Sequence, residues 1–131
     1  MTPSGQRRRH SSGGPWEDRF GYSRAVRVGD RIVVSGCTAA GDEESLASGD
    51  ARSQADAALA VAVAAVAAVG GRREDVVRTR MYLTRRADCD AVGAAHGAVF
   101  ADVRPAATMV VVAGLIDERM LVEIEVEAVV P

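Results

Sequence analysis

The sequence predicts an α+β fold with the element order β-β-α-β-α-β-β, in which two helices cover one face of a mixed sheet. Residues 76–84 and 121–130 show the period-two alternation of strands with one buried face. Two alanine-rich segments, at about 51–69 and 87–102, are expected to be helices between strands. Strands that are joined through helices place those helices against one face of the sheet. The other face is then left without a helical cover.

The first two strands are expected to form a hairpin. Residues 23–28 and 31–35 flank Gly29-Asp30, a pair that is typical of a tight hairpin turn. Residues 1–14 are polar, basic and rich in Gly and Ser, which predicts a disordered tail. Residues 15–131 are therefore expected to form a single domain, and the whole chain of 131 residues suits that size.

The first helix is expected to run from about Ala51 to Val69. Leu59, Val63 and Val66 share one of its faces, and Gly70-Gly71 ends it. Its uncharged part is shorter than the ~20 apolar residues that a membrane span requires. We therefore expect a closely packed core helix and no membrane segment.

The second helix is expected over about 87–102. Val92, Val99 and Phe100 should face the core, and Arg104-Pro105 ends the helix. A strand at 107–113 should follow it, before the final strand at 121–130.

The uncovered face of the sheet should be charged. The final strand alternates Val122, Ile124 and Val126 with three glutamates, and the strand at 76–84 places two arginines on the matching parity; these five charged residues are Glu123, Glu125, Glu127, Arg78 and Arg80. Such a face could be solvated, with surface ion pairs worth at most about 1 kcal/mol each. Alternatively, oligomerisation could enclose it.

The composition excludes several classes of function. A formal net charge of −2 and the absence of a basic face give no sign of nucleic-acid binding. Cys37 and Cys89 match no metal-ligand spacing and are expected to be reduced thiols, so no metal site is predicted. The N-terminus lacks the apolar core of a signal peptide, which predicts a cytoplasmic protein.

Five short segments, taken in order, resemble the Rid proteins, also called the YjgF family. They are Gly21-Tyr22-Ser23, residues 28–36, Val76-Val77-Arg78-Thr79, Arg104-Pro105-Ala106 and Val122-Glu123-Ile124-Glu125. The resemblance implies a chorismate-mutase-like α+β fold and a homotrimer whose open sheet faces form a barrel-like centre. It also implies that a small-molecule ligand binds in clefts between neighbouring subunits.

The resemblance further implies an activity. The family members best known by activity hydrolyse reactive imines and enamines to a keto acid and ammonia, and they need no metal or organic cofactor. Such chemistry requires an anchor for the substrate carboxylate, for which arginine is suited, and a carboxylate side chain that activates water. On this resemblance the chain is expected to be an imine or enamine hydrolase of the deaminase type.

Three residues correspond to positions in or beside the family's ligand cleft. Glu123 matches the water-positioning glutamate and is the expected catalytic residue. Tyr22 matches an aromatic residue near the cleft, and Cys37 follows the second strand at a loop that borders it. Cys37 is more readily explained as a small buried hydrophobic residue than as a nucleophile, and His96 is expected to be structural.

One departure changes the expected specificity. The family's anchoring arginine is replaced here by Ala107. We expect Ala107, Met109 and Val111 to lie on the open face as a small apolar wall of the substrate site, with Arg104 as a further candidate contact. A smaller or less anionic ligand would fit such a wall. The alternatives are a non-catalytic trimer that binds a metabolite or regulates, or a specialised biosynthetic step on a reactive intermediate.

Overall fold

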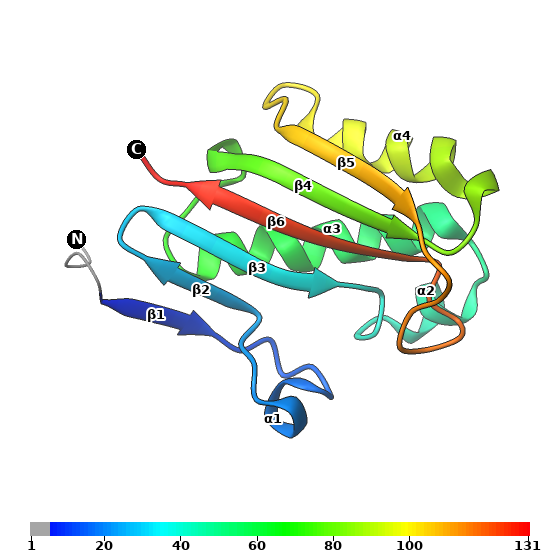
Figure 1. Cartoon of the computed structure of the whole chain (residues 1–131), viewed down its shortest axis with the longest axis horizontal. Coiled ribbons are helices and arrows are strands. Elements are labelled where there is room, and N and C mark those ends of the chain that lie inside the picture. The colour runs from blue at the N-terminus through cyan, green and yellow to red at the C-terminus, as the bar shows by residue number, and fades with distance from the viewer. Residues whose placement is uncertain (1–5) are drawn as a thin grey trace.

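The structure is a computed structural model and describes residues 6–131. It consists of one six-stranded sheet with its two long helices on one side (Figure 1). The elements in chain order are β1 (Arg7–His10), α1 (Glu17–Phe20), β2 (Ala25–Val28), β3 (Arg31–Cys37), α2 (Glu43–Ala47), α3 (Ala51–Ala68), η1 (Arg73–Asp75), β4 (Val76–Leu83), η2 (Arg86–Asp88), α4 (Cys89–Phe100), β5 (Ala106–Val111) and β6 (Val122–Val129).

The strand order in the sheet is β1-β2-β3-β6-β4-β5. Only the β4–β5 pair is parallel within this described sheet, and α4 supplies the crossover between these two strands. The last strand, β6, lies antiparallel between β3 and β4 and so joins the two halves of the sheet. The predicted α+β class and mixed sheet with helices on one face are confirmed, and the structure adds β1, α1 and α2.

The core lies between the sheet and α3, which packs against β3, β6 and α4. Ala55, Ala58 and Ala62 are fully buried beside Leu59 and Val66, and the small side chains let the helix approach the sheet closely. By length and composition alone α3 could span a membrane. One face of α3 is buried against the sheet, as in a core helix, and core helices of soluble proteins can have the same length and apolar composition.

The open face of the sheet carries the predicted charges. Val122, Ile124 and Val126 point to the core, while the glutamates between them are half-buried on the other side. The β4–β6 register pairs Arg78 with Glu127 and Arg80 with Glu125. The nitrogen–oxygen distances of these ion pairs are 3.5 and 3.4 Å. The prediction that arginines and glutamates share one face is therefore confirmed.

The prediction of which β5 side chains lie on the open face is wrong. The parallel register pairs Ala107 with Thr79 and Met109 with Met81, and both β4 partners are buried beneath the helices. Paired residues of neighbouring strands point to the same face. Ala107, Met109 and Val111 therefore point to the helical side, and the open face carries Ala106, Thr108 and Val110.

The N-terminal segment also differs from the prediction. Residues 1–5 lie outside the described part of the chain, but Arg7–His10 form the edge strand β1, which pairs antiparallel with β2. The expected disorder is therefore wrong for these residues. An edge strand is held by backbone hydrogen bonds, so its side chains can remain polar and exposed, which is the composition that suggested a tail.

The loop after β1 closes on the carboxylate of Glu17, which is 2% exposed. This carboxylate accepts hydrogen bonds from Ser11 Oγ at 3.0 Å and from the backbone nitrogens of Ser12 and Gly14 at 3.1 Å each. Its Oε2 lies 3.5 Å from Nη2 of Arg24. Burial opposes ionisation, but the hydrogen bonds from Ser12, Ser11 and Gly14 outweigh it and lower the pKa of Glu17 to about 2.

This carboxylate should make folding depend on pH. We expect Glu17→Gln to lower the free energy of unfolding at pH 7 by about 2 kcal/mol, because hydrogen bonds to a charged group contribute about 1.5–3 kcal/mol. A carboxylate with a depressed pKa stabilises the fold above its ordinary value of 4.5, and that stability is lost as the pH falls toward about 2. Urea unfolding between pH 7 and pH 3 measures this, with Glu44→Gln as an exposed control. A difference between wild type and Glu17→Gln that stays constant over this range would contradict the assignment.

Candidate functional site

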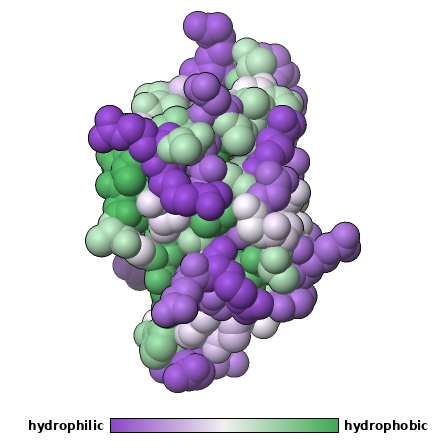
Figure 2. Space-filling model, turned by 90° about the vertical axis from the view of Figure 1, so that its right-hand side faces the viewer, coloured by the Kyte–Doolittle hydropathy of each residue, from purple (hydrophilic) through white to green (hydrophobic). Residues whose placement is uncertain are grey.

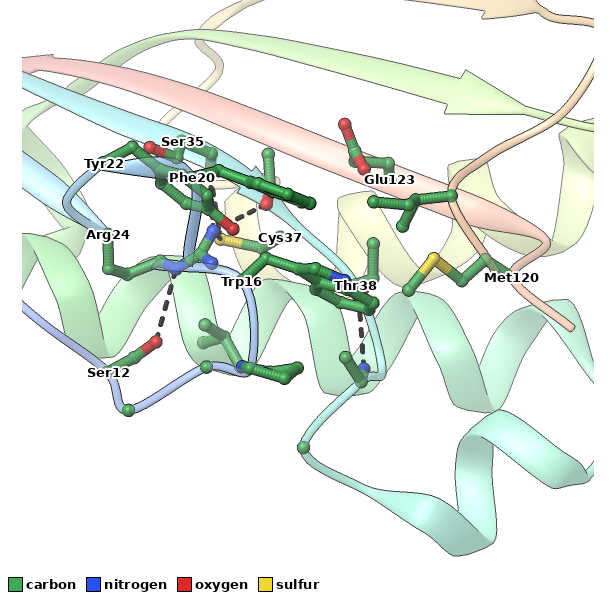
Figure 3. Close-up of a pocket in the computed structure, with 18 residues that line it drawn as sticks. Ser12, Trp16, Phe20, Tyr22, Arg24, Ser35, Cys37, Thr38, Met120 and Glu123 are labelled. Carbon is green, nitrogen blue, oxygen red and sulfur yellow. Dashed lines mark hydrogen bonds between the residues drawn. The ribbon is translucent and has the colours of Figure 1, made fainter. Parts of the chain in front are cut away.

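A pocket of about 790 Å³ opens where the C-terminal end of β3 meets the N-terminal end of β6 (Figure 3). Its walls come from four segments that are far apart in the sequence. They are the Ser12–Trp16 loop with α1 and the residues after it, the end of β3 with the loop to Gly41, α3 through Val61, and the segment from Ile116 to Glu123. The volume lies in the range of small-molecule sites.

Most of the wall is apolar. Phe20 and Tyr22 lie on one side and Met120 on the other (Figure 3), and Trp16 and Ile116 also line the pocket. Phe20 and Ile116 are 58% and 60% exposed, although both are large hydrophobic residues. Exposed hydrophobic side chains that gather around a hollow mark an interaction site.

Arg24 lies buried in the wall of this pocket, and its charge is already partnered there. Nη1 donates to the backbone oxygen of Gly36 at 2.6 Å, Nε donates to Ser12 Oγ at 3.4 Å, and Nη2 faces Glu17. The guanidinium carbon lies 5.7 Å from the centre of the Tyr22 ring, within cation–π range. Sequence reasoning missed this residue, although it directly follows the matched segment at Tyr22.

Cys37 lies at the back of the pocket and behaves as a buried thiol. Its Sγ donates to the backbone oxygen of Ser35 at 3.2 Å. Burial raises the pKa of the Cys37 thiol to about 11, although Arg24 acts in the opposite direction. The thiol is thus protonated at neutral pH, as a structural cysteine would be and a nucleophilic one would not.

Glu123 supplies the one carboxylate among the lining residues, and its side chain points into the pocket (Figure 3). It has no hydrogen-bond partner and no ion-pair partner within residues 6–131. Burial and the nearby charge of Glu125 raise the pKa of Glu123, and Arg24 offsets part of this shift. An unpaired, half-buried carboxylate with a raised pKa is suited to take up and return protons.

Gly36 makes room for this carboxylate. The β3–β6 register shifts by one residue between Val34 and Cys37, so Ser35 and Gly36 form a bulge in β3 opposite Glu125, the neighbour of Glu123 on the same face of β6. A Cβ atom at Gly36 would lie 2.7 Å from Cδ of Glu123, which is closer than carbon atoms pack. A side chain at position 36 and the observed position of the Glu123 carboxylate therefore exclude each other.

The structure brings together three of the predicted site residues, which are Tyr22, Cys37 and Glu123. Ala107, Met109 and Arg104 do not line this pocket. Met109 packs against the core, and Arg104 is exposed beside a shallow groove at the end of α4.

His96 and the possible metal ligands show no sign of a second functional site in the described residues. His96 Nε2 lies 2.8 Å from Oγ1 of the buried Thr79, and burial lowers the pKa of His96, as expected of a structural histidine. Across residues 6–131, no three His, Cys, Asp or Glu side chains are grouped so that they could hold a metal ion.

We expect Gly36→Ala to displace the carboxylate of Glu123 from the pocket, because the new Cβ would overlap it. Gly41→Ala is the matched control, since position 41 also lines the pocket and a Cβ there meets nothing within 4 Å. Crystal structures of both variants measure the effect. A Glu123 side chain that keeps its position beside Ala at position 36 would contradict this steric account.

Comparison with known proteins agrees with this fold. The model of the family described as Endoribonuclease L-PSP matches residues 17–130. The chain is 48% identical over 121 residues to the uncharacterized protein SCO2049 of Streptomyces coelicolor, which covers 92% of this chain and 90% of that protein. The crystal structure of Rv2704 from Mycobacterium tuberculosis, a member of the YjgF/YER057c/UK114 family, has a TM-score of 0.87 and 41% identity over 95% of this chain and 100% of that one.

The YjgF gene product of E. coli is also similar in structure. It has a TM-score of 0.75 and 29% identity, and the match covers 92% of each chain. The family match extends over almost the whole domain, and the resemblance to Rid proteins is thereby confirmed. The chain belongs to the Endoribonuclease L-PSP family, which is the YjgF or Rid family.

Proposed function

We propose that this protein hydrolyses small reactive imines or enamines to a carbonyl compound and ammonia, with Glu123 as the catalytic residue. The observation that carries the proposal is the unpaired carboxylate of Glu123 in a mostly apolar pocket. Water attack on an imine requires a base that takes a proton from water and an acid that returns it to nitrogen. One carboxylate can do both in turn.

The proposed reaction has two steps. A water oxygen forms a bond to the carbon of a protonated imine, the C=N electron pair moves to nitrogen, and a proton of the water passes to Glu123. Glu123 then returns this proton to the nitrogen of the carbinolamine. The C–N bond breaks as Glu123 takes the hydroxyl proton and the C=O bond forms, and the departing ammonia takes that proton from Glu123 and leaves as ammonium. Tyr22 and Trp16 shape the cleft and exclude bulk water from it. No metal and no organic cofactor takes part in this proposal.

A homotrimer belongs to the same proposal. The open sheet face carries exposed Val33, Val110 and Val129 between its ion pairs, and Val33 is 49% exposed. In Figure 2 a hydrophobic patch lies between hydrophilic groups at the left, which is the side of the open sheet face. Apolar residues mixed with paired charges favour a face that packs against other copies over one that is fully solvated.

In such a trimer the ligand cleft would lie between subunits. β5 is the edge strand at the end of the sheet opposite β1, and its backbone is free to approach a neighbour on one side. We propose that this edge closes the pocket of the next subunit and brings Ala107 and Arg104 to it, with Met109 supporting the strand from the core. The location of such a protein would be cytoplasmic, and neither nucleic acid nor membrane is a proposed partner.

A non-catalytic role is the second candidate. Ala107 stands where the family's active members carry an anchoring arginine, which favours a metabolite-binding or regulatory trimer or a specialised biosynthetic step. Cleavage of RNA, which the family's description names, has less support in this chain. Its net charge is −2, and Arg78 and Arg80 on the open face are already ion-paired with glutamates.

The first test is ammonia release from imines that a flavin oxidase generates in situ from amines and amino acids. We expect Glu123→Ala to lower kcat/KM by about 100-fold or more, because general acid–base catalysis contributes about 10²–10⁴-fold. Glu118→Ala, which removes an exposed glutamate outside the pocket, is the matched control and should keep the wild-type rate. Equal background rates for wild type and Glu123→Ala would end the proposal.

The second test is the pH profile. A base works only when ionised, so activity should be lost as the pH falls through the raised pKa of Glu123, and the acid limb of kcat/KM should lie above the ordinary value of 4.5. Glu125→Gln should move this limb to lower pH, because the charge of Glu125 raises that pKa. Gln at position 125 can still accept the hydrogen bonds from Tyr82 and Arg80.

Glu127→Gln is the control for this profile, since Glu127 lies on the same strand and face but is not among the groups that shift Glu123. It should leave the acid limb in place. An acid limb that moves equally in both variants, or in neither, would show that Glu123 is not the titrating base.

A further inference from the structure

We propose that the ligand of this pocket is a cation with an apolar, preferably aromatic, body and no carboxylate, such as the protonated imine of a primary amine. The reaction in this inference rests on the proposed function, whereas the binding preference does not. The inference follows from how the charges of the pocket are paired, from the composition of its walls and from its size.

The pocket offers no free positive charge to an anionic ligand. Arg24 is the one basic residue among its eighteen lining residues. Its guanidinium group donates to Gly36 and Ser12 and pairs with Glu17. The pKa of Glu17 is about 2, so this partner is negatively charged at neutral pH and the pair has no net charge.

Glu123 therefore sets the charge that a ligand meets. Within the described residues no cation lies within ion-pair distance of its carboxylate. An ammonium or iminium group placed there would make a charge-assisted hydrogen bond, which is stronger than one between neutral groups. A ligand carboxylate at the same place would face a like charge in a partly desolvated site, which disfavours its binding.

The walls match the remainder of such a ligand. Trp16, Phe20 and Tyr22 present aromatic rings to the pocket, and Ile116 and Met120 add aliphatic surface. Aromatic faces attract cations as well as apolar groups. The pocket volume of about 790 Å³ is also much larger than a two- or three-carbon imine requires. A phenylalkyl or similarly sized body would contact the aromatic and the aliphatic surface at once.

The sequence provides its own binding reporter. Trp16 is the single tryptophan of the chain and lines the pocket. A ligand that enters should therefore change the intrinsic tryptophan fluorescence, and titrations need no label. This readout does not depend on catalysis.

The binding experiment compares three probes of nearly the same shape: phenethylammonium, phenylalanine and 2-phenylethanol. Phenylalanine adds only a carboxylate to the first probe, and the alcohol lacks the charge. We expect phenethylammonium to bind at least tenfold more tightly than either. Glu123→Gln should remove its advantage over the alcohol, while Glu118→Gln, as the control, should retain it. Phenylalanine binding as tightly as phenethylammonium, or no binding of phenethylammonium, would overturn the inference.

The turnover experiment separates this inference from the proposed function. A flavin amine oxidase generates 2-phenylethanimine from phenethylamine, and an amino acid oxidase generates the corresponding imino acid from phenylalanine. Hydrolysis of the first consumes one water and yields phenylacetaldehyde and ammonia. We expect the protein to accelerate ammonia release from the amine-derived imine by at least tenfold more than from the imino acid.

The two ideas then fail in different ways. Faster release from the imino acid would overturn the ligand class and leave the hydrolase function standing. Tight, Glu123-dependent binding of phenethylammonium without acceleration of either reaction would support the ligand class and overturn the hydrolase function.

Discussion

The buried carboxylate of Glu17 is the interaction on which the pocket depends. It collects hydrogen bonds from the loop after β1 and an ion pair from Arg24, and so it joins the N-terminal strand, α1 and the start of β2 into one wall. A carboxylate can be buried in this way only when donors surround it, because an unpartnered buried charge is costly. The consequence for function is that the positive charge of Arg24 is neutralised before any ligand arrives.

A second constraint operates on the other side of the pocket. The Glu123 side chain lies against Gly36 in the bulge of β3, and the missing side chain of Gly36 leaves the space that the carboxylate occupies. The charge of Arg24 is neutralised by Glu17, so Glu123 carries the one charge of the pocket that has no partner. The rest of the lining is mostly aromatic or aliphatic. This pairing of charges, rather than the presence of an arginine as such, decides which ligands the site favours.

Most of the fold could be predicted because its signals are periodic. The alternation of Glu123, Glu125 and Glu127 with buried Val and Ile fixes β6, and the spacing of Leu59 and Val66 fixes the buried face of α3. The face of β5 could not be predicted in the same way. Residues 106–113 are nearly all small or apolar, so they carry no period-two signal, and only the register with β4 shows which side chains face the helices. The strand β1 could not be predicted either, because Arg7–His10 are polar and show no alternation. Backbone hydrogen bonds to β2 hold this edge strand in place.

The site could be predicted in part. Glu123, Tyr22 and Cys37 were found through the family resemblance and do meet at one pocket, but their surroundings could not be read from the sequence. Arg24 was missed because its partners, Ser12, Glu17 and Gly36, come from separate segments that no sequence pattern connects. The expected effect of Ala107 on specificity stays a prediction, because Ala107 does not line this pocket within its own chain.

A crystal structure of the protein with phenethylammonium bound is the most direct measurement of the central claim, which is that Glu123 provides the unpaired charge of an apolar site. We predict the ammonium nitrogen within hydrogen-bonding distance of the Glu123 carboxylate and the phenyl ring against Trp16 or Tyr22, with the Glu17–Arg24 pair unchanged. A ligand bound elsewhere, or one that displaces Glu17 from Arg24, would contradict the account.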